Sequence, residues 1–245
     1  KQKGIQKEVE VLEMVSGHEN IVDFYGAYYH QAPRTPSLPE GLWIATEFIT
    51  GATLQDLIGT RKTLGERWIS YICKQIITGL FHMQKKNVIH HDIKPGNILI
   101  TSLGEVKIGE FGFATFGGKS SSTFGTITYS APEVLANFAS NKLEYDHKTE
   151  IWSQVISAVQ LAAPDPPLCG PPPVWLLCWL KQRSSSFILH GFLRHFLSEF
   201  VLHCLINMPL RRPTAASTVS ELFLYGEKND RYCQQHLLKR LVSLW

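Results

Sequence analysis

Apolar residues recur at helical spacing in three parts of the chain. In residues 5–16 they alternate with glutamates, and in residues 67–86 isoleucines and leucines return every three or four positions. Both patterns predict amphipathic helices, and the longer one should bury one face. Residues 148–162 are apolar over a wide face and predict a core helix. Residues 131–138 carry a proline near their start, which is typical of a helix N-terminus.

Short runs of β-branched and aromatic residues predict strands between these helices. Residues 21–29 and 42–48 are two such runs, separated by a proline-rich loop, and predict a hairpin with a long connection. Residues 97–100 and 106–109 flank a turn and predict a second hairpin. Residues 164–173 are proline-rich and predict a loop, and beyond them the pattern indicates several short helices.

The order of these elements indicates the fold class. Residues 50–58 predict a short helix with Thr50 or Thr53 as its N-cap. One helix, a few strands and then mostly helices follow one another along the chain. This order favours an α+β fold with the sheet gathered toward the N-terminal end.

Composition narrows the class of protein. Of the 245 residues, 44% are hydrophobic and 18% charged, which is typical of a globular protein and argues against disorder. The net charge of +3 is too small to indicate a nucleic-acid partner. Five cysteines without a C-x-x-C pair favour reduced thiols, so we expect a cytoplasmic protein. The apolar run at residues 174–180 is too short for a membrane span.

The segment VIHHDIKPGNILI, residues 88–100, concentrates the candidate chemistry. Asp92, Lys94 and Asn97 lie within six residues, in a loop that Pro95 and its glycine neighbour keep out of a helix. A carboxylate that orients a hydroxyl, a cation for a phosphate and an amide oxygen for a metal are what phosphoryl transfer needs. The plainer alternative is a surface ion pair, which would contribute little.

Five segments in order resemble protein kinase motifs. HHDIKPGN resembles the catalytic loop, KIGEFG the D-F-G metal motif, GTITYSAPE the end of the activation segment, DHKTEIWS the start of the central helix and LRRP the late arginine motif. HENIVDFYGAYY and VIHHDIKPGNILIT are similar to the Misshapen/Nik branch of the germinal-centre-kinase group. The resemblance implies a two-lobe α+β fold, with residues 1–49 as a partial N-lobe and residues 50–245 as the C-lobe.

The resemblance also implies roles for individual residues. Asp92 would orient the substrate hydroxyl, Lys94 would steady the γ-phosphate, and Asn97 and Glu110 would hold Mg²⁺. The residues expected to bind ATP are Glu8 (the partner of a strand lysine), Thr46 (the gatekeeper), Glu47, Phe48 and Ile49 (the hinge), Asp56 (near the ribose) and Leu99 (under the adenine).

A second group of residues is expected to shape the activation segment and its support. Ser120, Ser121, Ser122 and Thr123 fall where activating phosphorylation is usual, and Thr126 matches the threonine that contacts the catalytic aspartate. His90, Glu150 and the pair Glu133–Arg212 match structural positions, the pair being a buried ion pair.

Several positions depart from the family pattern. Glu110 stands in place of an aspartate, which moves the carboxylate by about 1.5 Å. His91 replaces an arginine that receives a phosphate, and Glu150 replaces another aspartate. No glycine-rich loop or strand lysine precedes Glu8, so we expect this chain to bind ATP and Mg²⁺ weakly unless a longer protein supplies them.

Three functions therefore stay open at the level of sequence. The first is a serine/threonine protein kinase acting on protein substrates, and the branch it resembles implies stress-activated MAP kinase signalling and actin regulation as the setting. The second is a pseudokinase that serves as a scaffold or allosteric partner. The third, a plain helical interaction module, would require five ordered motifs to arise by chance.

Overall fold

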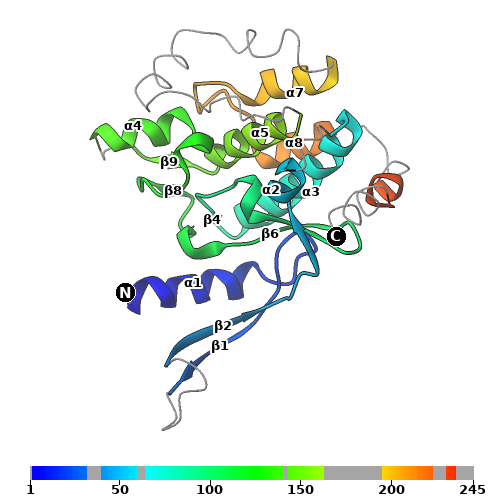
Figure 1. The fold of residues 1–245 in the computed structure, drawn as a ribbon. Helices are drawn as coiled ribbons and strands as arrows, with labels where there is room; N and C mark the ends of the chain where they lie inside the picture. Colours follow the sequence, from blue (N-terminus) through cyan, green and yellow to red (C-terminus); the bar gives the residue numbers. More distant parts are fainter. Residues whose placement is uncertain are drawn as a thin grey trace.

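The fold separates a small sheet-bearing end from a larger helical body. The computed structural model describes residues 2–31, 40–59, 64–140, 143–162, 195–222 and 230–235. Figure 1 shows helix α1 (Gln2–Val15) and the strands β1 (Phe24–His30) and β2 (Gly41–Thr46) at one end, with the other helices gathered at the opposite end. Within those described ranges, no helix is long and apolar enough to cross a membrane.

Strands β1 and β2 form the first predicted hairpin. They pair antiparallel, with His30 opposite Gly41 and a bulge between Phe24 and Gly26. β2 ends at Thr46, two residues before the predicted end, and the chain then crosses to the helical body. Ile21, the predicted first strand residue, instead forms an isolated parallel bridge with Ile108 and is fully buried.

A three-stranded antiparallel sheet lies at the junction of the two parts. Its order is β3 (Gly51–Thr53), β5 (Ile98–Thr101) and β6 (Val106–Ile108), of which the last two are the second predicted hairpin. β3 and β5 approach so closely at Gly51 that a Cβ atom there would lie 1.7 Å from the carbonyl oxygen of Ile100. Only glycine therefore fits at this position.

The predicted helix over residues 50–58 is wrong in its first part, where β3 runs instead. Helix α2 (Leu54–Gly59) begins after a reciprocal cap. The backbone N–H of Asp56 donates to Thr53 Oγ1 over 3.2 Å, and the Asp56 carboxylate accepts the Thr53 backbone N–H over 2.8 Å. Thr53 is thus the N-cap, and the residues before it are free to pair as a strand.

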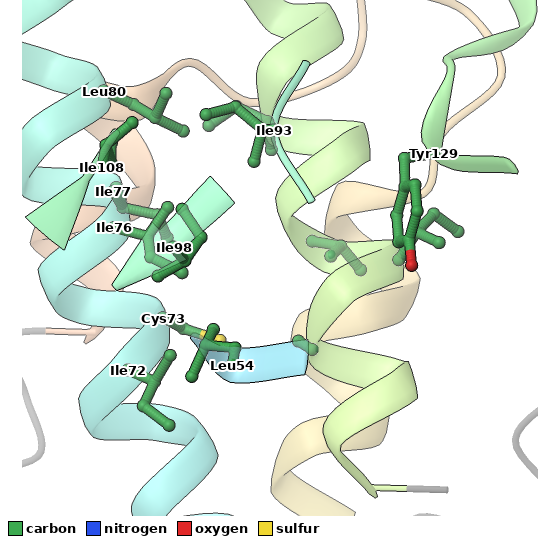
Figure 2. Packing of buried hydrophobic residues seen from close by; sticks show 14 of the residues in the cluster. Leu54, Ile72, Cys73, Ile76, Ile77, Leu80, Ile93, Ile98, Ile108 and Tyr129 are labelled. Carbon is green, nitrogen blue, oxygen red and sulfur yellow. The ribbon is translucent and has the colours of Figure 1, made fainter. Parts of the chain in front are cut away.

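Helices α3 (Glu66–Lys85) and α5 (Lys148–Ala162) form the centre of the body, and both match their predicted spans within one residue. Ile72, Ile76 and Leu80 of α3 are at most 3% exposed. Figure 2 shows side chains of α3 directed toward Ile98 and Ile108 of the sheet. Burying large aliphatic groups in this way contributes roughly 1.5–3 kcal/mol per side chain.

Shorter elements complete the body. The helices are α4 (Pro132–Ser140), which confirms the helix predicted over residues 131–138, α7 (His195–Cys204) and α8 (Ala215–Leu222). The short strands are β4 (Val88–Ile89) with β7 (Thr115–Phe116), and β8 (Lys119–Ser120) with β9 (Tyr145–Asp146). The 3₁₀ turns among the described residues include η1 (Pro95–Asn97), η2 (Phe111–Phe113) and η3 (Ile127–Tyr129). The short helices predicted between residues 163 and 194 lie outside the described residues.

The predicted α+β class is confirmed by this arrangement of small antiparallel sheets and packed helices. The division of the chain between residues 49 and 50 stays a prediction. Cys73, Cys204 and Cys233 are buried in the described part of the chain.

Candidate active site

The loop that carries the candidate chemistry is fixed at both ends by strands. It runs from β4, which pairs with β7, to β5 in the middle of the three-stranded sheet. His90 is completely buried, and its ring bridges the Asp92 backbone N–H (3.2 Å to Nδ1) and the Gly109 carbonyl oxygen (2.8 Å to Nε2). Nδ1 must accept and Nε2–H must donate, so the ring is neutral. Burial lowers its pKa to about 4.

Asp92 is the centre of a compact hydrogen-bonded cluster. Its carboxylate accepts from Lys94 Nζ over 2.7 Å, from Thr126 Oγ1 over 2.7 Å and from Asn97 Nδ2 over 2.9 Å. Lys94 Nζ also donates to Thr126 Oγ1 over 2.9 Å, which closes a triangle. Burial alone would raise the pKa of Asp92, but the hydrogen bonds from Lys94 and Thr126 outweigh it and lower the pKa. A buried, ionised carboxylate results, held in one orientation by three donors.

A backbone hydrogen bond between neighbouring segments brings Asn97 and Glu110 near each other. The Gly109 N–H donates to the Asn97 carbonyl oxygen over 2.9 Å, and Glu110 follows directly with an exposed side chain and a left-handed φ of 61°. Because Asn97 Nδ2 donates to Asp92, its amide oxygen is directed away from that bond. Within the described residues, no group of three histidine, cysteine, aspartate or glutamate side chains could hold a metal.

Glu8 of α1 lies beside the predicted metal motif. Its carboxylate oxygens are 3.9 Å from the point where a Cβ atom on Gly112 would stand. Burial raises the pKa of Glu8, and the negative charge of Glu110 raises it further. Glu8 and Glu110 therefore form an acidic pair that a cation would stabilise.

The residues predicted to bind ATP lie on α1, on β2 and the segment that follows it, on α2 and on β5. Thr46 ends β2 with an exposed side chain, and Phe48 is 85% exposed. Ile49, which follows Phe48, is half-buried. Leu99 on β5 is also half-buried, and its Cδ1 would lie 3.2 Å from a Cβ atom placed on Gly109. Asp56 is committed to the cap of α2, so a contact to a ribose would have to share that carboxylate.

Lys107 forms an ion pair with the predicted hinge residue Glu47, and the sequence did not predict this contact. Its Nζ lies 2.9 Å from Glu47 Oε2, and it is only 7% exposed. Glu47 also exchanges hydrogen bonds with Asp23: its backbone N–H donates to the Asp23 carbonyl over 2.7 Å, and its carboxylate accepts the Asp23 N–H over 3.2 Å. A lysine in a short strand gives no signal of burial by itself, because the partner lies sixty residues away in the chain.

The predicted phosphorylation segment is folded against the body. β8 includes Ser120, and the side chain of Ser122 contacts the hydroxyls of Ser120 (2.7 Å) and Tyr145 (3.2 Å). The Ser121 carbonyl accepts from Asn137 over 3.4 Å, and Ser121 is exposed, whereas Thr123 is half-buried. The Tyr145 contact was not predicted, because nothing in a single tyrosine of the sequence indicates it.

Glu133 and Arg212 form a bidentate ion pair deep in the body. Arg212 donates from both terminal nitrogens to the Glu133 carboxylate, over 2.6 and 3.0 Å, and also to the carbonyls of Ile206 and Lys148 over 3.0 Å each. Arg212 is 1% exposed and lies over the ring of Trp152. The pair links the end of the predicted activation segment to the chain just before α8.

Glu150 supports the candidate catalytic loop through a backbone hydrogen bond. Its Oε1 accepts the backbone N–H of His91 over 2.9 Å, whereas Oε2 is buried and has no hydrogen-bond partner among the described residues. Burial raises the pKa of Glu150 to about 7, and the nearby charge of Asp92 adds to this effect. A carboxyl with one unpartnered oxygen in this place is best accommodated in its protonated form.

We expect Glu150→Gln to remove a pH dependence of stability. The folded-state pKa of about 7 exceeds the unfolded value of 4.5, so the stabilising effect of the proton is complete below pH 4.5 and lost by pH 7. Between those pH values the free energy of unfolding of wild type should fall by roughly 3 kcal/mol relative to Glu150→Gln. Urea denaturation across this range, with the exposed Glu144→Gln as control, measures the difference. Parallel curves for wild type and Glu150→Gln would contradict the assignment.

Comparison with known proteins agrees with the geometry. The family model for the protein kinase domain matches residues 1–224. The chain is 33% identical to a Nik-related protein kinase of Mus musculus over 99% of this chain, 32% to a Misshapen-like kinase 1 of Rattus norvegicus over 93%, and 36% to the serine/threonine-protein kinase mig-15 of Caenorhabditis elegans over 73%. It spans 17% of the length of each of these relatives. The predicted Misshapen/Nik resemblance is confirmed, and the chain belongs to the protein kinase domain family.

Proposed function

We propose that the chain is the catalytic body of a serine/threonine protein kinase, which transfers the γ-phosphoryl group of Mg·ATP to hydroxyl groups of proteins. The observation that carries the proposal is the Asp92 carboxylate held by Lys94, Thr126 and Asn97 at 2.7–2.9 Å. The similar proteins support it, since mig-15 is a serine/threonine-protein kinase. The same comparisons do not favour the pseudokinase alternative.

The cluster suits phosphoryl transfer to a hydroxyl because each group has a distinct task. Asp92 is ionised and oriented, so it can accept a hydrogen bond from the attacking hydroxyl and align its lone pair. Lys94 lies next to that carboxylate and can also neutralise charge on the transferred phosphate. Thr126 bonds to both, so the acceptor residue would meet a preformed surface.

The oxygen donors on the neighbouring strand suit Mg²⁺. Asn97 contributes an amide oxygen and Glu110 a carboxylate, and such hard oxygen ligands are the ones that Mg²⁺ prefers. When bound, the metal would neutralise charge on the phosphates of ATP. Thr46, Phe48, Ile49 and the backbone of Glu47 would receive the adenine, together with Leu99 and Asp56. Glu8 would pair with the strand lysine of the family pattern, for which the described residues offer no match.

The setting is part of the proposal. We expect the protein to act in the cytoplasm, on protein substrates within a signalling cascade. The direct test is transfer of labelled phosphate from Mg·ATP to a serine- and threonine-containing protein by the full polypeptide in which this chain occurs. Failure of wild type to transfer phosphate, with ATP bound, would favour the scaffold role.

We expect Glu110→Asp to raise the rate of phosphoryl transfer, by up to ~10²-fold. The shorter side chain moves the carboxylate by about 1.5 Å, and Mg²⁺ requires near-ideal octahedral geometry. Aspartate also tolerates the left-handed backbone found at Glu110. The assay is kcat at saturating Mg·ATP, and Glu105→Asp on the preceding turn is the matched control. An unchanged or lower rate in Glu110→Asp would show that this carboxylate does not ligate the metal.

A further inference from the structure

Tyr145 joins the activation segment to the catalytic loop. It lies on β9, is 4% exposed, and directs its hydroxyl at three groups. The hydroxyl donates to the Ser122 carbonyl over 2.5 Å, and it lies 3.1 Å from His91 Nδ1 and 3.2 Å from Ser122 Oγ. The Tyr145 and His91 rings also meet edge to face, with centroids 5.8 Å apart.

The donors and acceptors of this network can be assigned one by one. The single proton of the Tyr145 hydroxyl goes to the Ser122 carbonyl, so its oxygen accepts from His91 Nδ1–H. His91 Nε2 then accepts from Thr115 Oγ1 over 2.8 Å. Both nitrogens of His91 are therefore engaged by neutral partners. Burial lowers the pKa of His91 to about 3, which agrees with a neutral ring.

His91 transmits this anchoring to the candidate catalytic aspartate. The backbone of His91 has a left-handed φ of 71°, and its N–H donates to Glu150. Its carbonyl oxygen packs so closely against Gly125 that a Cβ atom there would lie 2.2 Å from it. Asp92 follows His91, and Thr126 follows Gly125, and these two residues form the 2.7 Å hydrogen bond of the cluster. The catalytic-loop segment at Asp92 and the activation-segment residues at Thr126 are therefore held together where the acceptor hydroxyl would bind.

The network does not have the chemistry of a phosphate site. In the family pattern an arginine fork receives the activation-segment phosphate, whereas His91 is neutral and has no free nitrogen. Ser122 Oγ is already bonded to Ser120 and lies beside Tyr145. A phosphoryl group on Ser122 would add about −1.5 to −2 charges here and would displace these hydroxyl contacts. Lys7 and His147 act on His91 electrostatically, and the His91 backbone N–H is already bonded to Glu150.

We infer that Tyr145 is a positioning residue, whose hydroxyl holds the activation segment in register with the catalytic loop in place of a phosphoryl group. The inference rests on the proposed function for its effect on catalysis. The anchoring itself rests on the contacts of Tyr145, His91 and Ser122 alone. Phosphorylation of the segment is therefore unnecessary for an ordered acceptor site.

Hydrogen exchange and kinetics on the full polypeptide test this inference. In Tyr145→Phe, amides of residues 118–125 should exchange roughly five- to tenfold faster, as expected for the loss of one buried hydrogen bond. The KM for the protein substrate should rise by a similar factor while the KM for ATP stays unchanged. Phosphatase treatment of wild type should leave its rate unchanged. Tyr71→Phe, which removes a buried hydroxyl bonded to the Gly104 carbonyl, is the matched control.

A second pair of variants separates the network from general packing. Thr115→Val removes the hydroxyl bonded to His91 and should reproduce the faster exchange, whereas Thr115→Ser should restore wild-type exchange. Wild-type exchange in Tyr145→Phe, or loss of activity on phosphatase treatment, would overturn the inference. If wild type transfers no phosphate at all, the proposed function is wrong, and the exchange data still decide whether Tyr145 anchors the segment.

Discussion

Asp92→Asn should reduce phosphoryl transfer by on the order of 10³-fold while leaving the fold intact. The amide keeps a similar shape, but its single oxygen can replace only one of the two carboxylate oxygens that accept from Thr126 and from Asn97. It loses the negative charge that pairs with Lys94 at 2.7 Å and that would orient the attacking hydroxyl. Positioned acid–base groups typically contribute 10²–10⁴-fold to rate, and this is the basis of the expected magnitude.

Labelled-phosphate transfer at saturating Mg·ATP measures this loss, with thermal unfolding as the check on folding. The matched control is Asp230→Asn, which removes the charge from another aspartate–lysine pair, at 2.6 Å from Lys74 and remote in the chain. Asp230→Asn should transfer phosphate at the wild-type rate. Transfer that survives in Asp92→Asn would remove Asp92 from the mechanism.

Arg212→Leu should lower the free energy of unfolding by about 3–5 kcal/mol. The substitution leaves the Glu133 carboxylate, whose side chain is only 10% exposed, without its bidentate partner. It also removes the donors to the carbonyls of Ile206 and Lys148. Removing one partner of a buried pair is costly because the remaining charge keeps its desolvation penalty.

Urea denaturation provides the measurement, and the neighbouring Arg211 supplies the control. Arg211 is exposed, so Arg211→Leu should change stability by less than about 0.5 kcal/mol. Arg212→Lys retains the charge but not the planar fork, and it should fall between the two. A cost below about 1 kcal/mol for Arg212→Leu would mean that the pair is not what ties the activation segment to the body.

Sequence patterns predicted the regular elements well where periodicity and burial agree. The helices over residues 67–86 and 148–162 were predicted within one residue, because each has a continuous apolar face that packs in the core. The local spacing of Asp92, Lys94 and Asn97 also indicated their proximity, since a short loop between strands keeps them together.

Contacts between distant segments could not be predicted in the same way. Residues 51–53 form a strand because β5 lies within reach of Gly51, which the local sequence cannot reveal. Lys107 is buried because Glu47 neutralises it, and Tyr145 is engaged because His91 and Ser122 meet there. Each of these depends on a partner that tertiary structure alone brings near.

The ion pair between Lys107 and Glu47 has a consequence for motion. The chain enters the β1–β2 hairpin at Asp23 and leaves it at Glu47. These two residues are hydrogen-bonded to each other, and Glu47 also forms the ion pair with Lys107 of β6. Rotation of the hairpin against the three-stranded sheet must therefore pivot at this point or break a pair that is shielded from water. The far end of the hairpin would then sweep the widest arc, while the predicted adenine contacts beside the pivot would move least.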